Sequence, residues 1–322
     1  MRKMKKILSA TLVASMAMSL AACGSSTSDD VYHIGICQQL EHEALDAATQ
    51  GFQDALIEKL GEDKVQFDLQ NAQGEAVNCA SIANGFVADD VDLIMANATS
   101  ALQACSAATS EIPIVATSIT DYATALNATD WSGASGTNIT GTSDLAPLDQ
   151  QVDMLVELVP DVTQVGILYC SAEPNSAYQA TEVGKYLDEK GIAWKEYTAA
   201  DSNEIQSVVT NAIVDCDCIY IPTDNTMAAN TEIVKNVTVP AGIPVIAGEA
   251  GICAGGLATL SISYYDLGYK TGEMAYEILV NNADPATMEI EFAPKAEKQY
   301  NATIANELGI TIPDDYVAIE GY

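Results

Sequence analysis

The sequence predicts an α/β protein built from two doubly wound lobes, each a parallel sheet with helices on both faces. Short β-branched runs alternate with amphipathic stretches along most of the chain, which is typical of βαβ units. The segment VDLIMANAT, a helix and IPIVATS is echoed later by CDCIYIPTD, a helix and IPVIAGE, as if one unit occurred twice. The 322 residues also exceed the size at which single hydrophobic cores usually stop growing.

The expected strands are short apolar runs rich in β-branched residues. They lie at 31–37, 64–70, 92–98, 112–118, 164–170, 192–198, 217–222, 243–248 and 257–263. Helices fill the gaps, for example at 43–60, 75–88, 147–159, 176–190, 203–214 and 265–281. Parallel strands joined through helices require right-handed crossovers. Two similar lobes are then expected to face one another across a cleft.

The first 22 residues are typical of a secretory signal peptide. Four basic residues precede an apolar run that begins at Ile7 and is too short for a comfortable membrane span of about 20 residues. Leu20-Ala21-Ala22-Cys23 resembles a bacterial lipoprotein box, in which Cys23 would carry the lipid and become the new N-terminus. An ordinary cleaved signal with a chance cysteine is the alternative. Residues 23–30 are small and polar and suit a tether.

The charge balance limits the classes of partner. Without the first 22 residues the chain has nine basic residues against 45 acidic ones. Nucleic acid is excluded as a partner, because binding it requires a positive surface. Anionic lipid headgroups would also repel this body, so a lipid on Cys23 is the only expected membrane attachment.

The basic residues also indicate how a ligand would be held. The only arginine is Arg2, so the exported chain has no guanidinium clamp for phosphate or a dicarboxylate. A ligand carboxylate would have to be bound by backbone N–H groups at helix N-termini and by Ser or Thr hydroxyls. Acids in the same loops would suit an ammonium group. The sequence therefore favours a small zwitterion.

Polar side chains gather where the expected strands end, which is where ligands bind in open α/β sheets. Any one of them has an alternative role as a helix N-cap, and Glu173, next to Pro174, is expected to be solvated. The candidate ligand-binding residues are Gln38, Glu41, His42, Thr99, Ser100, Thr117, Thr120, Asp121, Tyr122, Ser143, Asp144, Asn175, Thr223, Asp224, Asn225, Glu249 and Tyr264.

Catalytic, metal and cofactor sites are not expected. The chain has two histidines, and His33 is expected to be a core residue of a buried strand. No H-E-x-x-H, G-x-S-x-G, G-x-G-x-x-G or P-loop motif occurs. Cys37 and His42 are a thiol–imidazole pair only if Cys37 leaves the core. Asp121 and Asp224 would suit a carboxylate-based hydrolase only if they lay about 5–10 Å apart.

Seven cysteines follow Cys23, mostly inside apolar runs where cysteine acts as a small hydrophobe. An odd number without a paired spacing gives no disulfide framework, although secretion would permit one. We expect reduced thiols and an anaerobic source.

Several blocks, in order, resemble the ABC-transporter substrate-binding protein family whose members include proteins similar to tryptophan- and tyrosine-binding lipoproteins. They are IGICQQLEHEALDAATQGFQDAL, DLQNAQGE, FVADDVDLIMANAT, IPIVATSITD, NITGTSDLAPLDQQVDML, IYIPTDNT and SISYYDLGYKTGEMAYEIL. The similarity extends from about Tyr32 to LGITIPDDY near the end of the chain.

The resemblance implies a type I periplasmic-binding-protein fold, in which a three-crossing hinge lets two lobes close on a ligand. We place the crossings near 142–146, 260–265 and 284–290. Lobe one is then 31–143 plus 265–283, and lobe two is 144–264 plus 284–322.

Carried over block by block, the resemblance implies that the cleft is lined by Glu41, His42, Thr120, Asp121, Ser143, Asp144, Thr223, Asp224 and Asn225. It also implies an extracytoplasmic, lipid-anchored receptor that works with an ABC permease and ATPase, and we expect a monomer. An aromatic amino acid is the implied ligand, and Tyr122, Tyr264 or Tyr265 would stack on its ring. Tyr122 departs from the family's usual proline, and Glu249 also departs from its pattern. A nucleoside or sugar, a sensor role, or a carboxylate-based hydrolase remain alternatives.

Overall fold

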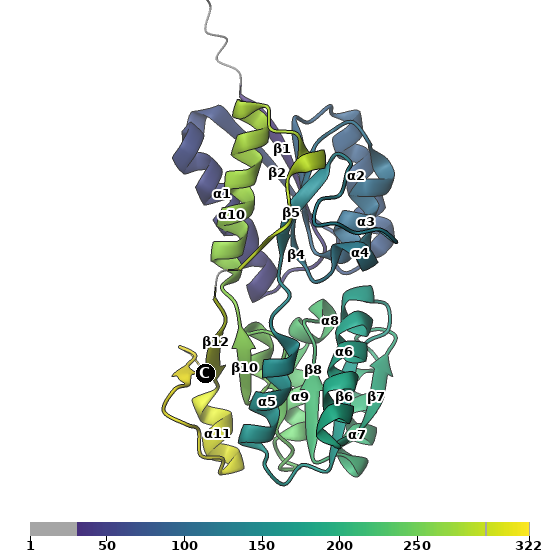
Figure 1. The fold of residues 1–322 in the computed structure, drawn as a ribbon, viewed down its shortest axis with the longest axis vertical. Coiled ribbons are helices and arrows are strands. Elements are labelled where there is room, and N and C mark those ends of the chain that lie inside the picture. The colour runs from purple at the N-terminus through teal and green to yellow at the C-terminus, as the bar shows by residue number, and fades with distance from the viewer. Residues whose placement is uncertain (1–30, 294, 322) are drawn as a thin grey trace, which may run out of the picture. The chain divides into compact units, whose positions relative to one another are not determined.

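The computed structural model describes residues 31–293 and 295–321, so the signal segment and Cys23 lie outside the described residues. From Tyr32 onward the chain forms one compact unit with two separate sheets (Figure 1). Among the described helices, none combines the length and the apolar composition needed to cross a membrane. The predicted fold class, two α/β lobes with mainly parallel sheets, is confirmed.

The first lobe is built on a six-stranded parallel sheet in the order β11-β5-β4-β3-β1-β2. Its central strands are buried at every residue, because they are continuous apolar runs covered on both faces. The strands are β1 (Tyr32–Gln38), β2 (Val65–Asn71), β3 (Leu93–Asn97), β4 (Ile114–Ile119), β5 (Ile139–Ser143) and β11 (Glu291–Phe292).

Helices cover both faces of this sheet. α1 and α10 pack on one face and α2 and α3 on the other, as the two core clusters of the lobe show (Figure 1). α1 and α10 approach closely at Gly268, where an added Cβ would lie 1.9 Å from the carbonyl oxygen of Ala48. The helices are α1 (Glu43–Leu60), α2 (Ala76–Ala88), α3 (Thr99–Ala108), α4 (Tyr122–Ala125) and α10 (Tyr264–Asn281), with short 3₁₀ helices η1 (Glu62–Lys64) and η3 (Pro285–Thr287).

The second lobe repeats this plan with a seven-stranded sheet in the order β13-β12-β10-β9-β8-β6-β7. All of its pairs are parallel except β10 with β12. The strands are β6 (Gln164–Cys170), β7 (Ala193–Ala199), β8 (Cys218–Ile221), β9 (Val245–Ala247), β10 (Ala258–Ser261), β12 (Glu297–Tyr300) and β13 (Val317–Ala318). The helices are α5 (Leu148–Leu158), α6 (Pro174–Lys190), α7 (Ile205–Asp215), α8 (Asn225–Ala228), α9 (Thr231–Thr238), α11 (Ala302–Leu308) and the 3₁₀ helix η2 (Gly251–Ala254).

The chain passes between the sheets after β5, after β10 and after β11 (Figure 1). The third connection follows Phe292 and does not lie at the predicted 284–290. The reason is that β11 pairs in parallel with β5, with Glu291 opposite Thr142 and Phe292 opposite Ser143. Residues 284–292 therefore belong with the first sheet, although the predicted second lobe included them.

In the first lobe, burial differs from expectation at His33. His33 was predicted to be buried in its strand, but it is exposed at the start of β1, where its backbone N–H donates to Asp92 Oδ2 at 2.7 Å.

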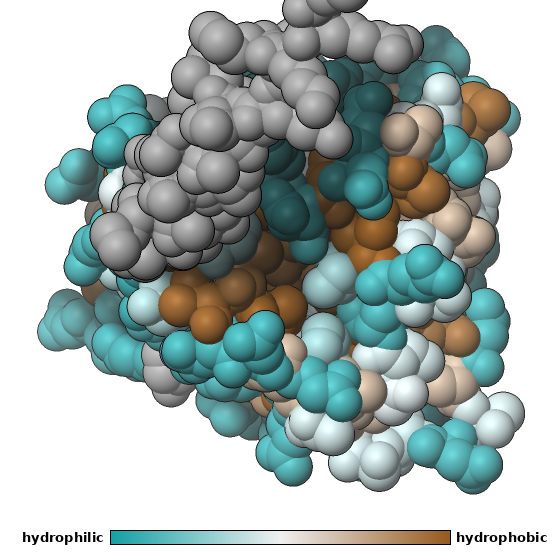
Figure 2. All heavy atoms as spheres, turned by 90° about the horizontal axis from the view of Figure 1, so that it is seen from above, coloured by the Kyte–Doolittle hydropathy of each residue, from teal (hydrophilic) through white to brown (hydrophobic). Residues whose placement is uncertain are grey.

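The end of the molecule seen in Figure 2 has hydrophilic residues around most of its visible rim and hydrophobic residues toward its middle. The seven described cysteines are free and buried, and Cys37, Cys79 and Cys105 share one core cluster.

Candidate functional site

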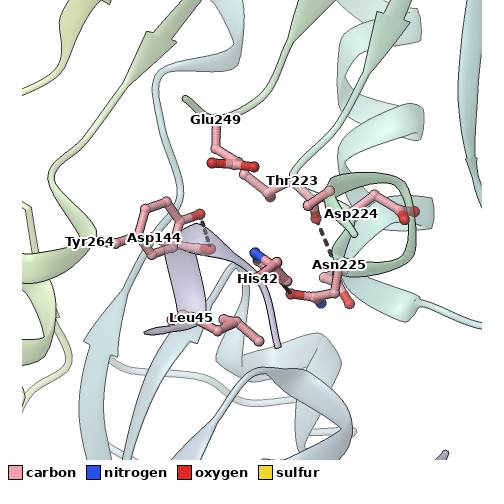
Figure 3. A pocket seen from close by; sticks show the side chains of 11 residues that line it. His42, Leu45, Asp144, Thr223, Asp224, Asn225, Glu249 and Tyr264 are labelled. Carbon is pink, nitrogen blue, oxygen red and sulfur yellow. Dashed lines mark hydrogen bonds between the residues drawn. The ribbon is translucent and has the colours of Figure 1, made fainter. Parts of the chain in front are cut away.

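A small cavity lies between the two lobes, at the carboxyl ends of their strands (Figure 3). The space open to the centre of a water-sized sphere is about 10 Å³, which is room for roughly one water molecule. The cavity is lined by His42, Leu45, Ser118, Asp144 and Tyr264 from the first lobe and its connections, and by Asn175, Thr223, Asp224, Asn225, Ala228 and Glu249 from the second.

The lining residues occupy strand ends and helix starts, which are fixed by the sheets behind them. His42 is the N-cap of α1, and Tyr264 is the first residue of α10. Asp144 directly follows β5, Glu249 follows β9, and Asp224 is the N-cap of α8. Polar side chains at these positions point beyond the sheets, because the strands themselves end there.

Side chains from the two lobes meet at the cavity. His42 Nε2 lies 3.1 Å from Asn225 Oδ1 (Figure 3). The hydroxyls of Thr120 and Thr223 are 3.4 Å apart, and Gln179 donates to both of them, at 3.2 Å to Thr120. These contacts join the lobes around the cavity.

Asp144 is a buried acid held by partners from the first lobe. Its two carboxylate oxygens accept hydrogen bonds from the hydroxyls of Tyr264 at 2.9 Å and Thr120 at 3.1 Å. Burial raises the pKa of Asp144, and these two hydrogen bonds oppose the rise. The side chain is 4% exposed, so any cation that enters the cavity meets this carboxyl group away from bulk water.

Two further acids belong to the second lobe. Glu249 accepts from the N–H groups of Gly251 at 2.6 Å and Ile252 at 2.9 Å, yet burial raises its pKa to about 7. Asp224 accepts from Cys170 N, Ser176 Oγ and Met227 N, all within 2.8 Å. Burial, and then the nearby Glu173 carboxylate, raise the pKa of Asp224. The described lining has no Lys or Arg to neutralise these groups.

Three buried polar atoms of the lining have no hydrogen-bond partner: His42 Nδ1, Ser118 Oγ and Asn175 Oδ1. Among the described residues, only five side-chain atoms share this property. Burial also lowers the pKa of His42, although Asn225 and nearby acids oppose this, so the neutral ring is favoured. Buried polar groups normally find partners, so this concentration points to a ligand.

Eight of the seventeen candidate residues line the cavity together: His42, Asp144, Asn175, Thr223, Asp224, Asn225, Glu249 and Tyr264. Two more lie directly behind them. Thr120 bonds Asp144 and Thr223, while Ser143 donates to the carbonyl oxygen of Thr120 at 3.1 Å.

Other candidates belong to the first lobe and do not line this cavity. Gln38 bonds Asp46 and Thr49, and Thr117 bonds Thr142. Glu41 is exposed, Thr99 is buried at the start of α3, and the Ser100 N–H donates to Gln39 Oε1 at 3.0 Å. These residues lie outside the lining.

Asp121 and Tyr122 also serve the first lobe itself. Asp121 caps α4 by accepting from Thr124 N at 2.7 Å, and it does not belong to the cavity lining that contains Asp224. Tyr122 is 3% exposed and stacks on Trp131, with ring centroids 5.9 Å apart. Its hydroxyl donates to the carbonyl oxygens of Ala116 and Thr142, so the ring is part of the core.

Three lining residues are not among the seventeen candidates: Leu45, Ser118 and Ala228. Ser118 could have been recognised from the sequence, because it is a polar residue at the end of a strand. Leu45 and Ala228 could not, because apolar residues within helices give no indication that they line a cavity. Glu173, predicted to be solvated, is 3% exposed. Gln179 was not selected, because a helix interior gives no sign that a side chain reaches two threonines.

The two sheets, their three connections and a polar cavity between the lobes define a two-lobed binding protein. The chain matches the family of ABC transporter substrate binding proteins over residues 33–320 and belongs to it. Proteins of this family act outside the cytoplasm, and the architecture is the type I periplasmic-binding-protein fold.

The chain is also similar to individual proteins of known ligand. The chain is 35% identical, over 87% of its length and 85% of the relative's, to the tyrosine-binding protein of Clostridioides difficile (strain R20291). A structure of the ABC domain from Streptococcus pneumonia in complex with L-Trp has 34% identity and a TM-score of 0.84, covering 88% of this chain and 97% of that one.

The ligand-free, open structure of a substrate-binding protein with adhesive properties from Clostridium difficile has 33% identity and a TM-score of 0.68, covering 91% of this chain and 100% of that one. All three relatives are binding proteins, not enzymes.

Proposed function

We propose that this chain is the lipid-anchored, extracytoplasmic receptor of an ABC importer and that it captures an aromatic amino acid between its lobes. The single observation that carries the ligand site is the set of unpaired buried atoms, His42 Nδ1, Ser118 Oγ and Asn175 Oδ1, on one cavity. The named ligands of the relatives, tyrosine and tryptophan, support the choice of ligand class.

The composition of the cavity suits both halves of such a ligand. Asp144 and Glu249 would face an α-ammonium group, and Ser118 Oγ would donate to the carboxylate. Leu45, Ala228 and the ring of Tyr264 offer apolar surface to an aromatic side chain. No Lys or Arg of the described lining competes with the ammonium group for these carboxyl groups.

A cavity of about 10 Å³ does not hold an amino acid in this arrangement, so the lobes must part to admit one. The ligand would then shift the balance toward a closed form whose contacts include the His42–Asn225 hydrogen bond. A permease and its ATPase would recognise that closed form, and the lipid on Cys23 would keep the receptor at the membrane.

A thermal-shift screen tests this function. The soluble body from residue 31 onward is mixed with the twenty amino acids, nucleosides and sugars, because a ligand that binds the folded state raises its melting temperature. We expect L-tryptophan or L-tyrosine to give the largest rise. A rise with a nucleoside or sugar, and none with any aromatic amino acid, would contradict the ligand assignment.

The lipid anchor needs its own test. In cells fed a fatty acid that can be traced by a label, the full chain should become labelled and fractionate with membranes. Cys23→Ser should abolish both. Equal labelling of the variant would contradict anchoring at Cys23.

A further inference from the structure

Glu173 is buried directly behind the cavity and accepts five hydrogen bonds. It is the N-cap of α6 and is 3% exposed. Thr226 donates to Oε1 through its N–H at 2.8 Å and its hydroxyl at 2.7 Å. Asn225 donates to Oε2 through its N–H at 3.0 Å and Nδ2 at 2.8 Å, and Asn175 Nδ2 donates at 3.2 Å.

These contacts determine the orientation of two amide groups. A carboxylate can only accept hydrogen bonds, so Asn175 and Asn225 must both turn their nitrogen toward Glu173. The carbonyl oxygen of Thr223, also an acceptor, receives Asn175 Nδ2 at 2.9 Å and requires the same orientation. The oxygen of each amide therefore points elsewhere.

The orientation of the Asn225 amide determines which ring nitrogen of His42 carries the hydrogen. Asn225 Oδ1 faces His42 Nε2 at 3.1 Å, and this oxygen can only accept, so Nε2 must carry the hydrogen. The other nitrogen of a neutral ring is then a bare acceptor. That nitrogen, Nδ1, is buried without a partner, as is Asn175 Oδ1.

The cavity thus presents two neutral acceptors in addition to the carboxyl groups of Asp144 and Glu249. An α-ammonium group has three N–H donors, and the two acidic side chains have open lone pairs to accept them. His42 Nδ1 and Asn175 Oδ1 then lack a donor unless the ligand brings another. A buried acceptor left unpaired costs binding free energy.

We infer that Glu173 is a positioning residue that makes this cavity accept hydrogen bonds, and that the cavity thereby selects amino acids with an N–H or O–H donor on the aromatic side chain. The inference rests on the proposed function and deepens it. Tryptophan and tyrosine supply the donor, whereas phenylalanine leaves the acceptors unpaired.

Isothermal titration with isosteric ligand pairs tests the selection. L-Tyrosine is compared with L-phenylalanine, and L-tryptophan with 3-(3-benzothienyl)-L-alanine, in which sulfur replaces the indole N–H and the ring system keeps nearly the same size and shape. The pair that decides is the one whose natural amino acid, tyrosine or tryptophan, binds more tightly. Within that pair, we expect the analogue to bind at least about tenfold more weakly than the natural amino acid. Equal affinities within that pair would overturn the inference and leave the proposed function standing. Failure of all four to bind would overturn both.

The variant Glu173→Gln tests the positioning role. A Gln amide can donate as well as accept, so both asparagines can turn over, and the affinity ratio within the pair should fall toward one. The control is Asp217→Asn. That acid accepts from Thr163 N, Thr163 Oγ1 and Gln164 N at the other end of β6, and its substitution should leave the ratio unchanged. An unchanged ratio in Glu173→Gln would overturn the positioning role.

Nitrogen-15 NMR of the wild type keeps the inference testable even if the variant does not fold. The chain has only two histidines, so His33→Gln assigns the signals. In the ligand-saturated protein, His42 should be neutral with hydrogen on Nε2, and a proton on Nδ1 would overturn the inference.

In the ligand-free protein, the side-chain amide protons of Asn175 and Asn225 should be protected from solvent exchange, because Glu173 and both asparagines lie in one lobe. Fast exchange at both would overturn the positioning role whether or not any ligand binds.

Discussion

Asp144 is the acid best placed to receive a ligand ammonium group, since both of its oxygens are already oriented by Thr120 and Tyr264. Asp144→Asn keeps the shape and removes the charge. We expect ligand binding to weaken by about 1.5–3 kcal/mol, which is roughly 10- to 150-fold in Kd, because hydrogen bonds to charged groups contribute that much. Isothermal titration measures the change.

The matched control for this substitution is Asp121→Asn. Asp121 caps α4 outside the cavity lining, and asparagine is an equally good N-cap. Its Kd should stay within about twofold of the wild type. A similar loss of affinity in both variants would show that Asp144 has no special role.

The raised pKa of Glu249 should make the stability of the folded protein depend on pH. Burial raises its pKa in the folded protein to about 7 from 4.5, so between these values the folded state binds more protons than the unfolded state. Stability from this residue is therefore present below pH 4.5 and is lost as the pH rises through 7, by roughly 3 kcal/mol. Denaturant unfolding at pH 4.5 and 7.5 should show that loss in the wild type relative to Glu249→Gln. Glu62→Gln, on the surface, should follow the wild type, and parallel curves for all three would contradict the expectation.

At the level of elements, the repeated halves place an aspartate N-cap before a one-turn helix in each lobe. Asp121 caps α4 and accepts one N–H, from Thr124. Asp224 caps α8 and also accepts from Cys170 N in β6 and Ser176 Oγ in α6. Equivalent aspartates of the two lobes therefore accept different numbers of hydrogen bonds, and only the one in the second lobe also connects to a strand and a second helix.

Replacing each cap with alanine measures this difference. Asp121→Ala should lower the free energy of unfolding by about 1 kcal/mol, the usual cost of a lost N-cap. Asp224→Ala leaves three buried donors unpaired and should cost about 3 kcal/mol or more. Urea unfolding of both variants gives the comparison, and equal losses would show that the contacts to β6 and α6 contribute little.

The elements that sequence could predict are those with a strong local pattern. The apolar runs of β3 and β4 are buried at every residue, as continuous β-branched segments indicate. β5 (ITGTS) and the two-residue β11 have no such pattern, and only pairing with a neighbouring strand makes them strands. The position of the third connection depends on that pairing, so sequence placed it several residues early.

The candidate site was predictable to the extent that it follows from strand ends. Asp224 and Glu249 lie close together because the parallel strands β8 and β9 end at the same edge of the second sheet, and Asp144, at the end of β5, lines the same cavity from the first lobe. The direction of a side chain is set by tertiary contacts instead. Tyr122 turns into the core because two carbonyl oxygens accept hydrogen bonds from its hydroxyl, and Glu173 is buried because the first residues of α8 donate to it.

For the whole molecule, the proposed function requires a balance between separated and closed lobes. The superposition is better on the L-Trp complex, at a TM-score of 0.84, than on the ligand-free, open relative, at 0.68. Gln179 links the two lobes from outside the cavity lining, since it donates to Thr120 of the first lobe and to Thr223 of its own lobe.

Gln179→Ala should therefore destabilise the closed form without removing a ligand contact. Loss of one hydrogen bond between the lobes, about 0.5–1.5 kcal/mol, should weaken apparent binding by roughly 2- to 12-fold, because affinity scales with the population of the binding-competent form. Stopped-flow measurements should show faster ligand dissociation, and small-angle scattering should show a smaller contraction at a fixed, subsaturating ligand concentration. The control is Gln151→Ala, a buried glutamine that bonds Gly248, Leu260 and Tyr220 within the second lobe. It should lower the melting temperature and leave the dissociation rate unchanged, whereas faster dissociation in this variant alone would place the control of closure elsewhere.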